Sequence, residues 1–211
     1  MTSHRRTALE RRTAALGAPI VVLAMFFIFA WAALPAAAGP RKPVSHVKEY
    51  ANEVAFWNAR RTMWVDDANT QAGGLQDAIT QMEDAQASGS QDAVNAYEVT
   101  DAAAYLAWTK AVYKYRDRWS SWIREFRSTC LPWFTTAKGK AKFKSACESL
   151  SNAADSLLKT AWGLIIDGYG ALGHSDTSTA QSKEVLALAA IGFADDHLES
   201  AIARLKQLKP E

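Results

Sequence analysis

Residues 94–126, VNAYEVTDAAAYLAWTKAVYKYRDRWSSWIREF, decide the fold of this chain. Apolar and aromatic residues recur in this stretch at steps of three, four or eight, the spacing of one face of an α-helix. That face consists of Val94, Tyr97, Tyr105, Trp108, Val112, Tyr115, Trp119, Trp122 and Phe126. The stretch predicts a helix of about 36 residues, which is about 54 Å long.

Helical patterns also precede and follow this stretch. We expect a first helix over residues 45–71, ended by Gly73 and Gly74, and a short second helix over residues 75–82. A fourth helix is expected from Phe143 into the glycine-rich residues 168–173. A fifth helix is expected to follow a capping box of Ser178 and Gln181. No part of the chain alternates with a period of two for long enough to predict a strand.

Long helices joined by short turns indicate an all-α fold. The sequence therefore predicts an elongated antiparallel helical bundle of four long helices plus one short helix, with heptad-like, coiled-coil packing. With 211 residues, 49% of them hydrophobic, the chain is expected to form one packed domain and not a disordered chain. A net charge of +2 argues against a uniformly basic nucleic-acid binder.

The first 38 residues have the features of a secretory signal peptide. Four arginines precede an apolar run over residues 20–34, and an A-x-A site ends at Ala38. The alternative is an uncleaved membrane anchor, because residues 18–38 form an apolar stretch of 21 residues and about 20 can span a bilayer. We expect cleavage, a linker over residues 39–44 and a helical bundle domain over residues 45–209. Both alternatives predict export by the general secretory route, to the cell envelope or the extracellular space.

The chain has two cysteines, Cys130 and Cys147. In an oxidising compartment outside the cell they are expected to form one disulfide around an 18-residue segment. Two cysteines this far apart, with no histidine nearby in sequence, do not indicate a zinc site.

Motifs for catalysis or cofactor binding give no assignment. Residues 168–173 match G-x-G-x-x-G, but the match follows a helical pattern and precedes a loop, so we interpret it as glycines that end a helix. No histidine has a glutamate three residues before it, as a di-iron bundle requires. The polar cluster Asp195, Asp196 and His197 is interpreted as a solvated helix face. We expect no enzyme activity, no metal and no cofactor.

Charge is the unusual feature of the sequence. Residues 110–144 contain ten basic and two acidic side chains, and the rest of the expected mature chain sums to −9. An antiparallel bundle would gather this whole segment at one end, together with Arg204, Lys206 and Lys209, and the acidic residues toward the other end. Lys138, Lys140, Lys142 and Lys144 lie at the start of the fourth helix, where the helix dipole disfavours cations, so local stability does not explain them.

These observations predict a non-enzymatic protein that binds an anionic surface or acidic macromolecule through a basic, aromatic-rich pole. Membrane, envelope polymer and protein are possible partners, whereas nucleic acid is not favoured. The candidate binding residues are Trp119, Trp122, Arg124, Arg127, Trp133, Phe134, Lys138, Lys140, Lys142 and Lys144. The alternative function is a carrier of a small hydrophobic ligand or haem in the aromatic interior of the bundle.

Overall fold

The computed structural model describes residues 46–210, which contain helices and no strands. The expected signal peptide or anchor and the linker that follows it lie outside the described residues. The helices are α1 (Val47–Ala87), α2 (Gln91–Cys130), a 3-10 turn η1 (Leu131–Trp133), α3 (Ala137–Asp155), a π-helical segment η2 (Ser156–Ala161), α4 (Trp162–Leu172) and α5 (Thr177–Lys206). Because α3, η2 and α4 follow one another without a break, the unit has four long helices, as the sequence predicts.

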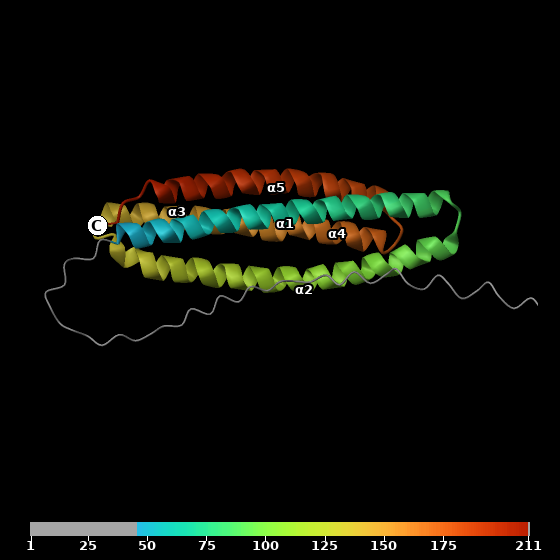
Figure 1. The fold of residues 1–211 in the computed structure, drawn as a ribbon, viewed down its shortest axis with the longest axis horizontal. Helices are drawn as coiled ribbons and strands as arrows, with labels where there is room; N and C mark the ends of the chain where they lie inside the picture. The colour runs from blue at the N-terminus through green and yellow to red at the C-terminus, as the bar shows by residue number, and fades with distance from the viewer. Residues whose placement is uncertain (1–45, 211) are drawn as a thin grey trace, which may run out of the picture. The chain divides into compact units, whose positions relative to one another are not determined.

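The four long helices run side by side with alternating direction (Figure 1). A tight turn joins α1 to α2, where Gly89 has a φ of 68°, a backbone conformation that glycine adopts without strain. The starts of α1 and α3 and the ends of α2 and α5 lie at one end of the bundle (Figure 1). Segments that are far apart in the sequence therefore form one surface there.

The expected short helix over residues 75–82 is wrong, because α1 continues through Gly73 and Gly74. Ala72, Leu75 and Ile79 on either side of the glycines are fully buried, and they keep the steps of three and four of a single apolar face. A glycine inside a helix costs about 1 kcal/mol relative to alanine. Burial of this uninterrupted face outweighs that cost.

The glycine-rich stretch was expected to end the helix, but Gly168 and Gly170 lie inside α4, which continues to Leu172. Only Gly173 is at the C-cap. Gly168 lies where α4 meets α1, and a Cβ atom there would be 2.5 Å from Leu75 Cδ2. A Cβ on Gly170 would lie 3.1 Å from the ring of Tyr105 on α2. Gly168 and Gly170 therefore allow α4 to approach its neighbours closely.

The cap of α5 also differs from the expected capping box. Asp176, and not Ser178, is the N-cap, and its carboxylate accepts a hydrogen bond from the Thr179 backbone N–H at 3.0 Å. The Ser178 hydroxyl donates to the same carboxylate oxygen at 3.1 Å. These hydrogen bonds, chiefly those from Thr179, lower the pKa of Asp176. Aspartate caps a helix as well as serine does, so the sequence alone did not separate the two.

Aromatic side chains fill the core near the end where α1 begins. Tyr50, Trp57, Trp64, Trp119, Phe126, Phe134 and Phe143 are all buried. Their rings touch: the Trp64 and Trp119 centroids are 3.5 Å apart and those of Phe134 and Phe143 are 4.9 Å apart.

The other half of α2 packs less tightly than the aromatic pattern predicts. Between Gln91 and Arg118 the only buried side chain is Asp101. Trp108 is half-buried and lies 5.6 Å from the ring of Trp162, whereas Tyr105 and Tyr115 are exposed. Hence the apolar face of residues 94–126 is fully buried only toward its C-terminal end, whereas Val94, Tyr97, Trp108 and Val112 are half-buried against the core.

Candidate functional site: a basic pole

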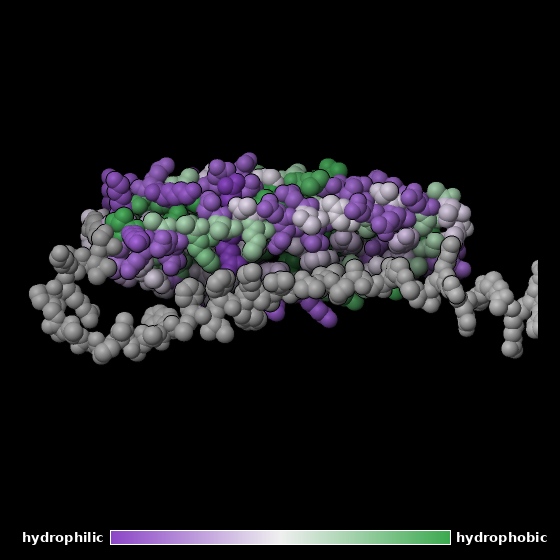
Figure 2. All heavy atoms as spheres, in the orientation of Figure 1, coloured by the Kyte–Doolittle hydropathy of each residue, from purple (hydrophilic) through white to green (hydrophobic). Residues whose placement is uncertain are grey.

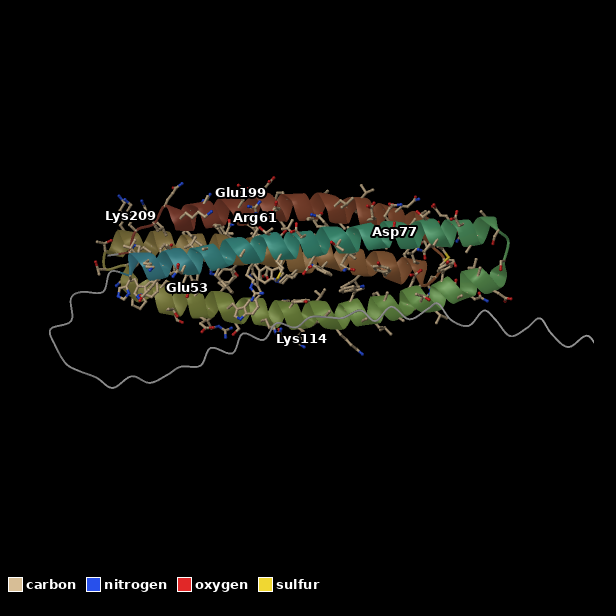
Figure 3. The ribbon with its side chains drawn as sticks, viewed as in Figure 1. Glu53, Arg61, Asp77, Lys114, Glu199 and Lys209 are labelled. Atoms are coloured by element: carbon tan, nitrogen blue, oxygen red, sulfur yellow. The ribbon has the colours of Figure 1, made fainter. Side chains whose placement is uncertain are left out.

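The end of the bundle where α1 and α3 begin carries most of the positive charge. It is formed by residues 46–54, 123–148 and 203–210, which we call the basic pole. These segments contain four acidic residues and ten basic ones, namely Lys48, Arg124, Arg127, Lys138, Lys140, Lys142, Lys144, Arg204, Lys206 and Lys209. Figure 3 places Lys209 at this end. The return of α5 to this end, expected from an antiparallel bundle, adds its last basic residues to the pole.

The opposite end is acidic. Residues 76–102 and 165–184, which lie at or near that end (Figure 1), contain nine acidic residues and one lysine. Figure 3 shows Asp77 on the half of α1 nearer to this end. The fold thus separates the charges along the bundle, as the sequence predicts.

The four lysines of α3 occupy the first turns of their helix and are exposed. Thr136 is the N-cap, and its hydroxyl accepts a hydrogen bond from the Gly139 backbone N–H at 3.1 Å. Lys138 and Lys140 follow within four positions of the cap, and the first turn has no acidic residue. Their charges face the positive end of the helix dipole, which disfavours cations by about 0.3–1 kcal/mol each. The helix would be more stable without them.

The basic side chains of the pole have no carboxylate partner within residues 46–210. The ion pairs of these residues involve other basic groups: Arg61 with Asp195 and Glu199, Lys159 with Asp155, Lys183 with Asp167, and His46 with Glu49. Arg61 bridges α1 to α5 (Figure 3) and its Nη2 lies 3.0 Å from Glu199 Oε2. The cluster interpreted as a solvated face therefore holds two helices together through Asp195, while His197 is exposed.

Part of the expected basic segment lies outside the pole. Lys110, Lys114, Arg116 and Arg118 are exposed along α2, and Figure 3 shows Lys114 on the outer side of that helix, away from the end of the bundle. Arg124 is exposed and Arg127 is half-buried in the last turns of α2.

Two of the expected aromatic binding residues belong to the core. Trp119 and Phe134 are each only 2% exposed, so neither can touch a partner. Trp119 packs against Trp57 and Trp64, and Phe134 packs against Tyr50 and Phe143. Aromatic residues at helical spacing are more often part of the core than of a binding surface, and spacing alone does not show which individual residues are buried.

Trp122 and Trp133 are half-buried and each is covered by a neighbour on α1 or at its start. The Arg60 guanidinium lies 4.6 Å from the centroid of the Trp122 ring, a cation–π contact that the sequence did not reveal. The Trp133 ring stacks on His46, with centroids 4.9 Å apart and an interplanar angle of 6°. Each of these two rings has one face occupied, and only Trp133 belongs to the pole, since Trp122 lies just outside it.

Cys130 and Cys147 are both buried free thiols, and they are not within bonding distance of each other. Burial is the largest cause that raises the pKa of each thiol to about 12. The charge of Cys147 further raises the pKa of Cys130, and Arg127 lowers that of Cys147. The disulfide is absent from the structure and stays a prediction for the exported protein.

Two shallow hollows at the pole involve residues that sequence reasoning missed. One lies between α3 and the end of α5, and the other lies between the start of α1 and the C-terminal segment; Leu208 lines both. The only signal in the sequence was the antiparallel arrangement, which brings residues 47–55 and 206–210 together.

Within residues 46–210 no group of three metal-ligating side chains comes together. In the same part of the chain, no helix is both long and apolar enough to cross a membrane.

Comparisons with protein-family models, curated proteins and solved structures give no match to this chain. The function is therefore argued from the pole itself.

Proposed function

We propose that this chain is an exported, non-enzymatic helical-bundle protein that binds an anionic partner or surface through its basic pole. The observation that supports the proposal is the set of ten basic side chains at one end, without carboxylate partners among the described residues. Two of these charges, those of Lys138 and Lys140, lie in the first turn of α3 and reduce the stability of that helix. Folding stability does not explain these charges, whereas a role in binding does.

The proposal includes export, cleavage after Ala38 and a location outside the cell, in the envelope or the medium. Its support is the arginine-rich start, the apolar run and the A-x-A site of the sequence. The intact mass of the exported protein tests this part. A chain that begins at Gly39 agrees with it, and a chain that keeps residues 1–38 in the membrane contradicts cleavage.

Co-sedimentation with vesicles tests binding. Vesicles of phosphatidylcholine with phosphatidylglycerol should bind the exported protein, and vesicles of phosphatidylcholine alone should not. Changing Lys138, Lys140, Lys142 and Lys144 to glutamine should weaken binding by up to about a thousandfold, since each basic residue near an anionic surface contributes about 1 kcal/mol. Binding should also fall as salt rises, because charges are screened beyond about 8 Å at physiological ionic strength.

The double variant Lys110→Gln/Lys114→Gln is the matched control, because both lysines are exposed on α2 outside the pole. It should retain most of the binding of the parent. If the quadruple variant binds as the parent does across the salt series, the basic pole is not the binding surface.

The alternative function, a carrier of a hydrophobic ligand or haem, has one supporting observation. The indole N–H groups of Trp57 and Trp119 are buried and have no hydrogen-bond acceptor in the part of the chain that the structure describes. However, the surrounding rings already contact one another, with centroids 3.5–5.6 Å apart. A visible absorption spectrum of the purified protein and an extraction for bound lipid test this alternative.

A further inference from the structure

The C-terminal segment separates two different hollows at the basic pole. The hollow between α3 and α5 has a volume of about 500 Å³ and is lined by the polar residues Lys142, Ser145, Arg204 and Gln207 and by the apolar residues Ala141, Ala146 and Leu208. Among residues 46–210, no acidic side chain lines it. Two cations and two neutral hydrogen-bonding groups therefore face one space, which suits a phosphate or another anionic head group.

The second hollow is an apolar groove of about 290 Å³. Val47, Tyr50 and Val54 of α1 form one side, and Leu208 and Pro210 form the other. Val47 is 51% exposed, although it belongs to a surface that is otherwise strongly charged. Lys206 and Lys209 also line the groove, so its surroundings are cationic.

Leu208 contributes to both hollows, so the cationic hollow and the apolar groove are separated by little more than one side chain. Figure 2 shows hydrophobic surface directly beside strongly hydrophilic surface at this end of the bundle. A nucleic acid or an acidic polymer would use the cations but leave the groove empty. An anionic lipid would occupy both.

We infer that the basic pole binds an anionic phospholipid, with the phosphate in the hollow of Lys142 and Arg204 and part of one acyl chain in the groove between Val47 and Leu208. This inference rests on the proposed function and names its partner. The groove is at the lower end of the 300–1,000 Å³ typical of small-molecule sites, so it holds part of a chain and not a whole lipid. The rest of the lipid stays in the bilayer, and the protein docks on the membrane surface.

Soluble alkyl phosphates test the inference without a membrane. Affinity should rise from inorganic phosphate through hexyl, octyl and decyl phosphate by about fourfold for each methylene that enters the groove. Decyl maltoside, which has the chain but no charge, should bind much more weakly than decyl phosphate. The inference is overturned if decyl phosphate binds no tighter than inorganic phosphate, or if decyl maltoside binds as tightly as decyl phosphate.

A neutral double variant, Val47→Gln/Ala51→Gln, removes apolar surface from the groove without changing the charge, since Ala51 is also an exposed lining residue. It should bind decyl phosphate at least tenfold more weakly and inorganic phosphate as the parent does. The matched control is Leu186→Gln/Ala189→Gln, which changes two exposed apolar residues of α5 outside the pole and should bind as the parent does. The variant Lys142→Gln/Arg204→Gln should weaken binding of both phosphates.

Vesicles separate this inference from the proposed function. If the quadruple lysine variant loses vesicle binding while the groove variant binds vesicles and decyl phosphate as the parent does, the pole binds anions by charge alone. In that case the lipid inference fails and the proposed function stands. If neither variant changes vesicle binding, both fail.

Discussion

Gly168 of α4 lies directly against Leu75 of α1, so that a Cβ atom on the glycine would be 2.5 Å from Leu75 Cδ2 and 3.2 Å from Cδ1. Both residues are buried, and Leu75 has no exposed surface toward which it could move. The contact sets how closely α4 approaches α1, in the half of the bundle where α2 packs least tightly.

Gly168→Ala should therefore lower the free energy of unfolding by about 1–3 kcal/mol, the usual cost of overpacking a core. Gly163→Ala is the control in the same helix, because a Cβ atom there meets nothing within 4 Å. It should be neutral or raise stability by up to about 1 kcal/mol through helix propensity. Urea unfolding of both variants measures the difference, and equal stabilities would show that the contact does not constrain the helices.

Asp101 is a second weak point of this region, since it is 4% exposed and its Oδ2 atom has no hydrogen-bond partner among the described residues. Burial raises the pKa of Asp101 to about 6. The pKa of Tyr169 is also raised, mainly by its own burial and then by the charge of Asp101. An ionised carboxylate is thus held in a site that favours the protonated form.

The raised pKa gives a direction for the effect of pH. Well below the unfolded pKa of 3.8 the carboxyl is protonated in both states; the penalty grows as the pH rises from that value and is complete above the folded pKa of about 6. The difference between the unfolded and folded pKa corresponds to a loss of at most about 3 kcal/mol in the free energy of unfolding. Asp101→Asn should therefore be more stable than the parent at pH 8 and similar to it at pH 4. If the stability difference between the two proteins does not change with pH, ionisation of Asp101 does not destabilise the fold.

The position of the lysines on α3 predicts opposite effects on stability and on binding. Lys138→Glu places an anion in the first turn, where the helix dipole favours it by about 0.3–1 kcal/mol. The variant should melt at a higher temperature than the parent while binding anionic vesicles more weakly. Lys144→Glu, about two turns farther along, should weaken binding without the gain in stability. If Lys138→Glu melts lower, the lysine has a structural role.

The bundle could be predicted from the sequence because burial repeats with helical spacing over long stretches. Leu150, Leu157 and Leu198 are buried as that spacing indicates. The prediction of helix ends was wrong where a local sequence signal competed with packing. Gly73 and Gly74 indicate a helix end, yet the buried residues around them keep α1 continuous.

The charged pole could also be predicted, because charge follows from sequence and the antiparallel arrangement brings the helix ends together. Its aromatic residues could be predicted only in part. Trp119 and Trp122 are three residues apart, yet the first is buried and the second is half-buried under Arg60. That difference depends on the rotation of α2 against α1, which spacing does not reveal.

The two cysteines give the last prediction, because the structure shows buried free thiols and the expected compartment is oxidising. Cys130 is the last residue of α2, whereas Cys147 lies in the middle of α3 and not near its start. A disulfide requires Cα atoms about 4.4–6.8 Å apart, and because the thiols are not within bonding distance, the bond would need the middle of α3 to shift against the end of α2. Such a bond would stabilise the protein by about 3 kcal/mol on the chain-entropy estimate.

Thiol titration of the exported protein, denatured without reductant, should find no free thiol, and reduction should lower its melting temperature. In the reduced, folded protein both thiols should react slowly with alkylating agents at pH 8, because burial and a pKa of about 12 leave little thiolate. Cys130→Ala should lose the oxidised state but keep the fold. Two free thiols per chain in the denatured exported protein would show that the chain leaves the cell with Cys130 and Cys147 unpaired, as the structure has them.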